Sequence, residues 1–316
     1  MMDQQCIKSI INIISDSNMS DLDFLNIITR PVTYKVDEDG NETHEVHICI
    51  CDGNHRKSFL PETWIAENLL LFTVFDGYLE NAYGLTEGAS FKEHYNNLPE
   101  NTPIEIIGKN CYRVLKIIRN GIKHKLSNVN NSSGNYKINY GYRNTSYALQ
   151  ISKNGVRNLY TLIMNIIKGQ ISGMSKEYTT PGHYDGIMHA LYADMNKEIT
   201  QLSDDIGANL LTVPSGLKLR ASIRYPVINP IIIDEDNATI TFKHIENNGT
   251  DDENSNQYFY STDYIYNNYL LPQEIGVITK GEGDSLQERI KSATIKFEKN
   301  CIEEKWKLIG SENKTV

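Results

Sequence analysis

A short run in the middle of the chain, Arg119-Asn120-Gly121-Ile122-Lys123-His124, combines side chains that can cleave RNA without a metal. Such cleavage uses the neighbouring ribose hydroxyl as the nucleophile, and it needs proton transfer and positive charge at the phosphate. His124 can transfer the proton, because imidazole has an ordinary pKa of about 6.5. Arg119 is permanently charged and can stabilise the transition state, while Asn120 can orient either group. These three residues are the candidate catalytic residues.

The spacing of Arg119 and His124 raises a geometric problem. Five residues apart on a straight helix, the two side chains point about 140° away from each other. Two arrangements solve it: a local bend at Gly121, or a two-fold dimer that brings two copies of the run into one cleft. Asp76 and Glu80 lie one turn apart on a preceding predicted helix. A further interpretation is that one of these two carboxylates contacts Arg119.

Positive charge is concentrated around this run. No Asp or Glu occurs from Ile106 to Lys176, whereas twelve Lys and Arg do, although the whole chain has a net charge of −9. Six tyrosines are interleaved, and tyrosine rings can stack on unpaired bases while cations contact phosphates. The pattern predicts RNA binding; the alternative is a basic face that balances acidic neighbours within the fold. The predicted RNA contacts are Lys109, Arg113, Lys116, Lys123, Lys125 and Arg143.

Composition narrows the class of protein. Apolar residues make up 40% and charged residues 22% of the 316 residues, which is ordinary for a globular chain. The sequence contains neither a membrane-spanning apolar run nor the basic start of a signal peptide, so we expect a cytoplasmic protein without membrane contact. Five scattered cysteines predict reduced thiols. The cluster at His47, Cys49, Cys51 and His55 matches no zinc spacing, so we expect neither a metal nor a cofactor.

Hydrophobic periodicity predicts the elements that position the candidate residues. Helical spacing predicts helices over 7–14, 64–83, 91–97, from about 105 to 122, 156–167, 184–211 and 285–308. Alternation predicts strands over 32–36 and 46–50, a short hairpin around 136–140, and a second hairpin formed by 223–233 and 238–245. On the helix from 105, the spacing predicts one apolar face and one basic face.

At Arg119 to His124 the sequence resembles the HEPN domain superfamily, whose signature is Arg, a polar residue, any three residues, then His. The resemblance covers about residues 60 to 170 and includes the two amphipathic helices that precede the run. It implies a four-helix bundle, a homodimer, and metal-independent endoribonuclease activity in toxin, antiviral-defence and abortive-infection settings. Some members of such a family only bind RNA or assemble.

The predicted fold is mainly α with β additions, in three parts. Residues 1–58 form an N-terminal helix and β-hairpin, 59–172 a HEPN-like helical bundle with a basic face, and 173–316 an acidic α+β accessory domain. The predicted function is a metal-independent endoribonuclease of a toxin or antiviral-defence type, with His124 and Arg119 at a dimer cleft. The alternative is a non-catalytic RNA-binding or assembly module of a defence or regulatory system. An antitoxin or defence protein is a further expected partner.

Overall fold

The computed structural model describes most of the chain, which forms two compact units. Unit 1 comprises residues 1–25, 54–172 and 188–216, and unit 2 comprises residues 26–53, 173–187 and 217–316. Within these units the described residues are 5–7, 9–10, 29–36, 42–46, 64–125, 128–132, 134–221, 223–244, 261–279, 281–282 and 292–308. Among them, no helix combines the length and the apolar character that a membrane crossing requires.

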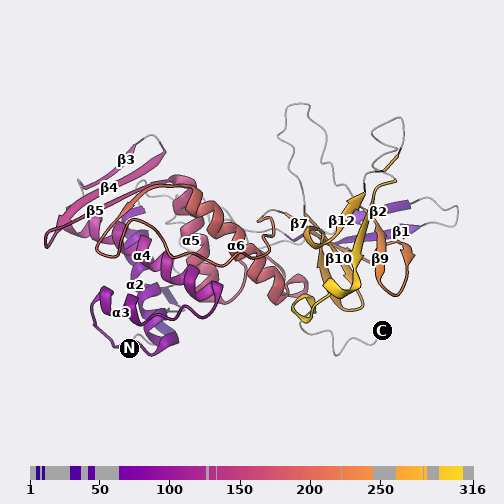
Figure 1. Cartoon of the computed structure of the whole chain (residues 1–316), viewed down its shortest axis with the longest axis horizontal. Coiled ribbons are helices and arrows are strands. Elements are labelled where there is room, and N and C mark those ends of the chain that lie inside the picture. Colours follow the sequence, from indigo (N-terminus) through magenta and orange to yellow (C-terminus); the bar gives the residue numbers. More distant parts are fainter. Residues whose placement is uncertain are drawn as a thin grey trace. The chain divides into compact units, whose positions relative to one another are not determined.

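Helices make up most of unit 1 (Figure 1). They are α2 (Trp64–Tyr83), α3 (Phe91–Asn97), α4 (Pro103–His124) and α5 (Lys153–Lys168), followed by α6 (Pro181–Lys197), within which the boundary between the units falls. α4 starts at a capping box in which the Thr102 hydroxyl accepts from the Glu105 N–H and the Glu105 carboxylate accepts from the Thr102 N–H. α4 packs against α2, α3 and α5, so it forms the centre of the unit.

Four antiparallel strands complete unit 1. They are β3 (Val129–Ser132), β4 (Asn135–Tyr142), β5 (Thr145–Ser152) and β6 (Ile199–Ser203), in that order across the sheet. Figure 1 shows β3, β4 and β5 running side by side next to α4. Arg143 and Asn144 join β4 to β5 with φ angles of 45° and 63°, the left-handed conformation that tight hairpin turns use. Because β3 begins at Val129, the sheet follows α4 directly in the sequence.

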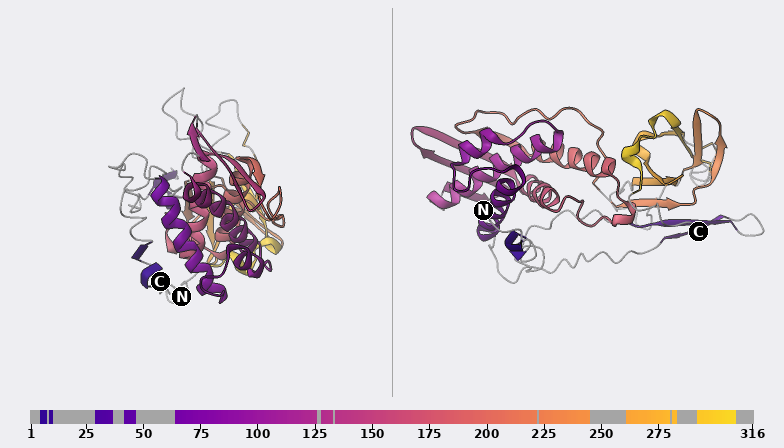
Figure 2. Two further views of the ribbon diagram at one scale, coloured as in Figure 1. Left: turned by 90° about the vertical axis from the view of Figure 1, so that its left-hand side faces the viewer. Right: turned by 90° about the horizontal axis from the view of Figure 1, so that it is seen from below.

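Two sheets are the main elements of the described part of unit 2, which is drawn from a second side in Figure 2. The five-stranded sheet has the order β11 (Tyr269–Pro272), β10 (Ser261–Tyr266), β7 (Arg224–Ile228), β1 (Val32–Val36) and β2 (Glu42–Val46). The four-stranded sheet has the order β12 (Val277–Thr279), β13 (Thr294–Glu298), β9 (Thr239–Lys243) and β8 (Ile232–Glu235). The two sheets pack through aromatic rings, since Tyr264 contacts both Phe242 and Phe297. Short 3-10 helices occur at Lys176–Tyr178, Gln273–Ile275, Lys299–Cys301 and Glu304–Trp306.

A buried polar network ties the five-stranded sheet to the first turn of α6 within unit 2. His183 Nδ1 lies 2.7 Å from the Thr180 hydroxyl, and its Nε2 lies 3.2 Å from an Asp263 oxygen. Arg224 donates to Asp263 and to Glu274. Burial alone raises the pKa of Asp263, but Arg224 and His183 outweigh it and lower that pKa to about 2. Thr180, His183, Arg224 and Asp263 are buried, so most of this network lies inside unit 2.

The predicted fold class is wrong: the protein is α+β, because three multi-stranded sheets accompany the helices. The helix predicted over 184–211 ends at Lys197 and is followed by β6, while the stretch predicted as a helix to 308 contains β13 and two 3-10 helices. The strand predicted over 223–233 is two strands, β7 and β8, which belong to different sheets. The helix predicted over 7–14 and the strand predicted over 46–50 lie mostly outside the described residues.

Both units are discontinuous in sequence, so the three consecutive segments expected from the sequence do not correspond to the two compact units. The N-terminal hairpin pairs with β7 in unit 2, and residues 188–216 complete unit 1.

Candidate functional site

The last turn and a half of α4 carries all three candidate catalytic residues. Arg119 is half-buried, and one of its terminal nitrogens donates to Asn120 Oδ1 at 2.7 Å. The Arg119 guanidinium also lies 4.9 Å from the centre of the Phe72 ring on α2, which adds a cation–π contact. Arg119 is therefore held in place by one neighbour on its own helix and one on α2.

His124 is the final residue of α4, and its side chain is exposed. Its ring lies 5.6 Å from the ring of Tyr140 and 5.2 Å from that of Tyr142, both on β4. The guanidinium of Arg143, in the β4–β5 turn, lies 5.1 Å from the centre of the Tyr142 ring. His124 is thus held against an aromatic surface whose outer edge carries a cation.

Asn120 contacts Arg119 and lies close to the aromatic surface on which His124 packs. It accepts from Arg119, and it also lies close enough to Tyr140 to affect that hydroxyl: burial raises the pKa of Tyr140, and Asn120 partly opposes this. The ring of Tyr140 in turn packs against His124. The side chain of Asn120 therefore contacts Arg119 directly and reaches the tyrosine that packs on His124.

Gly121 allows α4 to lie close to the sheet and does not interrupt the helix. α4 is continuous from Pro103 to His124. A Cβ at position 121 would lie 2.5 Å from Ile138 Cγ2 on β4, a distance that requires movement. The helix therefore continues through Gly121 without a break, and the close approach to β4 is the observed role of this glycine.

Three of the six predicted RNA contacts are buried inside unit 1 and paired with carboxylates. Arg113 is 1% exposed and donates to both carboxylate oxygens of Asp204. Lys109 pairs with Glu100 at 2.7 Å, and Lys116 pairs with Asp205 at 3.1 Å. Lys116 lowers the pKa of Asp205 although burial opposes this. The prediction of a basic outer face on α4 is wrong for these three residues, which balance acidic neighbours within the fold.

The other three predicted contacts are exposed. Lys123 and Lys125 flank His124 in sequence, and Arg143 packs on Tyr142. Among the described residues, none of these three cations forms an ion pair. These three side chains form a small positive surface at the end of α4, beside the exposed ring of Tyr142. A phosphate can contact the cations while a base stacks on the tyrosine.

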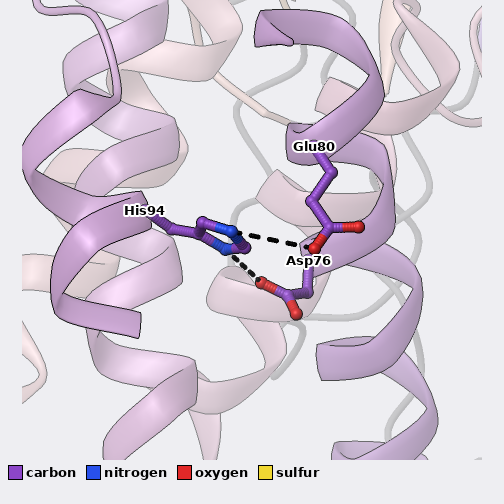
Figure 3. Close-up of side chains that lie close together, drawn as sticks. All are labelled: Asp76, Glu80 and His94. Atoms are coloured by element: carbon purple, nitrogen blue, oxygen red, sulfur yellow. Dashed lines mark hydrogen bonds and ion pairs between the residues drawn. The ribbon is translucent and has the colours of Figure 1, made fainter. Parts of the chain in front are cut away.

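Asp76 and Glu80 face a histidine and make no described bond to Arg119. Figure 3 shows both carboxylates of α2 turned toward the ring of His94 on α3. Asp76 Oδ1 lies 3.3 Å from His94 Nδ1, and Glu80 Oε1 lies 3.7 Å from His94 Nε2. The Tyr112 hydroxyl on α4 donates to Asp76. His94 is not recognisable as a site residue from the sequence, because neither its spacing from Asp76 nor its place on a seven-residue helix matches a known pattern.

Comparison with known proteins gives no relative: no protein-family model, no curated protein and no solved structure matches this chain. The resemblance to the HEPN superfamily rests on the run from Arg119 to His124 and on the helices that precede it.

Proposed function

We propose that unit 1 is a metal-independent endoribonuclease of a toxin or antiviral-defence type, in which His124 transfers a proton and Arg119 stabilises the negative charge that develops on the phosphate. The ribose 2′-hydroxyl attacks the phosphorus and the bond to the 5′-oxygen breaks, which leaves a 2′,3′-cyclic phosphate and a 5′-hydroxyl. No group other than the RNA hydroxyl is needed as the nucleophile. The resemblance to the HEPN superfamily favours this chemistry.

The observation that supports the proposal most directly is the arrangement of the run at the end of α4. His124 is exposed to solvent on an aromatic surface, and Arg119 is fixed by Asn120 and Phe72. A reacting histidine must be accessible, whereas a group that stabilises charge works best when it is held in one position. Lys123, Lys125 and Arg143 supply exposed positive charge beside His124.

The continuity of α4 favours a dimer. On a regular helix, side chains five residues apart point about 140° away from each other, which favours a cleft that takes Arg119 and His124 from different chains. A two-fold axis near the end of α4 would place His124 of one chain against Arg119 of the other. The proposal therefore includes a homodimer whose cleft holds both copies of the run.

Cleavage of a mixed tRNA and mRNA pool in the presence of EDTA tests the activity. We expect the parent protein to cut RNA and leave cyclic-phosphate ends, and we expect His124→Ala and Arg119→Ala to lose cleavage by about 10²-fold or more. Lys153→Ala, which removes an exposed cation at the start of α5, is the matched control and should cut normally. Binding of RNA by all proteins without any cleavage would favour the non-catalytic RNA-binding module.

Mixing the two inactive variants tests the dimer. After unfolding and refolding together, about half of the dimers carry one intact His124 and one intact Arg119 from different chains. We expect the mixture to recover cleavage that neither variant has alone. A mixture as inactive as its components, although analytical ultracentrifugation shows dimers, would contradict a site shared between two chains.

A further inference from the structure

Asp76, Glu80 and His94 bring two carboxylates and one imidazole together in one place, away from the run at the end of α4. One ligand atom from each lies within 4.8 Å of the other two, and no other such group of His, Cys, Asp or Glu occurs among the described residues. The side chain of His94 is 3% exposed and that of Glu80 is 9% exposed, while that of Asp76 is 30% exposed. The cluster is therefore buried on two sides and reachable by a small ion on the third.

The hydrogen bonds of His94 determine which nitrogen is available. Nε2 lies 2.8 Å from the backbone carbonyl of Thr86, which can only accept, so this nitrogen carries a proton. Nδ1 faces Asp76 Oδ1 at 3.3 Å. A lone pair on Nδ1 that faces a carboxylate oxygen is repulsive unless a cation lies between the two atoms. That cation is either a proton on Nδ1 or a metal ion.

The surroundings of Glu80 favour a metal ion over a proton on His94 Nδ1. The side chain of Glu80 is 9% exposed and its carboxylate turns toward His94 (Figure 3), yet Nε2 directs its proton to Thr86 instead. Among the described residues, no Lys or Arg pairs with Glu80, and no donor is bonded to its carboxylate. A proton on His94 would leave two carboxylates against one positive charge in a mostly buried place. A divalent ion would balance both, and buried charges are paired or bind metals.

The geometry of His94 and Asp76 also fits. Two ligand atoms that bind the same ion at about 2.1 Å lie about 3.0 to 3.5 Å apart, and the distance from Nδ1 to Asp76 Oδ1 falls in this range. One ligand atom of Glu80 lies within 4.8 Å of the other two residues' ligand atoms. Histidines that bind metals usually donate their other N–H to a carbonyl or carboxylate, as His94 does to Thr86. Carboxylate ligands are likewise held by hydrogen bonds, and the Tyr112 hydroxyl donates to Asp76. Burial and Asp76 raise the pKa of Tyr112 far above its usual range, so this hydroxyl remains a donor.

We propose that Asp76, Glu80 and His94 form a binding site for one divalent metal ion of the manganese or zinc type, with His94 Nδ1 as the nitrogen ligand. One imidazole and two carboxylates suit these ions better than Cu⁺ or an iron–sulfur cluster, which prefer thiolates. The ion would connect α3 to α2, and α3 carries Phe91 and Tyr95, over whose rings lie Lys116 and Lys109. The role is structural, and the proposed cleavage chemistry does not depend on it.

Titration of the full chain with Mn²⁺, followed by the electron paramagnetic resonance signal of the free ion, tests the site. Mn²⁺ is the preferred probe because it binds thiolates poorly, so the cysteines of the chain do not interfere. We expect one Mn²⁺ per chain, with a nitrogen coupling from one imidazole in the pulsed spectrum, and we expect Zn²⁺ to displace it. Failure of the folded parent protein to bind Mn²⁺, or a bound ion without nitrogen coupling, would overturn the proposal.

Substitutions that keep side-chain size locate the bound ion. Asp76→Asn combined with Glu80→Gln should abolish Mn²⁺ binding, and Tyr112→Phe should weaken it by about 10- to 100-fold because Asp76 loses its donor. Glu93→Gln removes an exposed carboxylate on the same helix α3 and should change nothing. Undiminished binding by the folded double variant would reject these ligands.

Metal binding is measured without RNA, so its result does not depend on whether the protein cleaves RNA. His124→Ala should bind Mn²⁺ as the parent does, even where it cuts no RNA.

Discussion

Four acceptors hold the guanidinium of Arg113 inside unit 1. It donates to both oxygens of Asp204, at 3.0 and 2.7 Å, and to the carbonyls of Gly207 and Asn209, each at 2.6 Å. Substitution by Met leaves the Asp204 carboxylate buried without its cation. We therefore expect Arg113→Met to lower the free energy of unfolding by about 3 to 5 kcal/mol, measured by urea denaturation.

Lys153→Ala is the control that removes a positive charge without removing a buried ion pair. Lys153 is an exposed cation on α5, and its loss should change the free energy of unfolding by no more than about 0.5 kcal/mol. Equal effects of the two substitutions would mean that Arg113 is not buried as described.

His244 makes the stability of unit 2 depend on pH. Burial lowers the pKa of this histidine from 6.5 to about 4, and Nδ1 lies 2.8 Å from the Tyr264 hydroxyl. Because the unfolded chain takes up the proton at a higher pH than the folded chain, acid favours unfolding. Stability is present above pH 6.5 and is lost as the pH falls toward 4. We expect a loss of about 2 kcal/mol between pH 7 and pH 5 from this residue alone.

Urea denaturation of the parent and of His244→Gln at both pH values measures this loss. Glutamine does not titrate, so the variant should lose less stability over the same interval. An identical pH dependence of parent and variant would exclude His244 as its source.

At the scale of elements, the contact between α4 and β4 connects stability to the proposed chemistry. Ile138 is fully buried, so a methyl group at Gly121 cannot be accommodated without movement of β4. We expect Gly121→Ala to lower the free energy of unfolding by about 1 to 3 kcal/mol. It should also reduce RNA cleavage, since Tyr140 and Tyr142 move away from His124 when β4 moves.

Gly141 provides a matched control on the same strand. A Cβ there meets no atom within 4 Å, so Gly141→Ala should leave both stability and cleavage nearly unchanged. The prediction fails if the two alanine substitutions behave alike.

The helices α2, α3 and α4 were predictable because the information that defines them is local. Apolar residues recur at helical spacing, and Ser90 and Thr102 cap the first turns of α3 and α4. The bounds predicted for α2 and α3, 64–83 and 91–97, are confirmed.

Strands whose partners lie far away in sequence were not predictable in this way. β6 pairs with β5 across the whole of α5 and α6, and β13 pairs with β9. A short strand is stabilised by the neighbouring strands of its sheet. The residues of the strand itself do not indicate which strands those will be.

The predicted basic face failed for a related reason. Arg113 and Lys116 follow the polar spacing of an exposed helix surface, and only the fold brings Asp204 and Asp205 to them from about 90 residues away. The run from Arg119 to His124 was recognisable because its residue types lie next to each other. The cluster of Asp76, Glu80 and His94 was not, because it is assembled from two helices, α2 and α3.

At the scale of the whole molecule, both units depend on distant parts of the chain. Residues 188–216 return to unit 1, where the carbonyl of Leu211 accepts from Asn110 and the Tyr192 hydroxyl bonds to the same side chain. A chain shortened to end at Lys176 retains α2 to α5 but lacks these partners and Asp204. We expect it to bind a hydrophobic dye and to unfold without a cooperative transition. A sharp urea transition in the shortened chain would contradict this.

The parallel pairing of Val32 with Val227 places one of the earliest strands of the chain beside a strand that follows it by about 190 residues. During synthesis the hairpin of β1 and β2 emerges from the ribosome long before β7 exists. Until then the free edge of β1 offers unpaired backbone groups, which attract other strands. Unit 2 must therefore complete its fold after most of the chain has been translated, and a newly made chain would be most prone to aggregation, and most dependent on chaperones, in that interval.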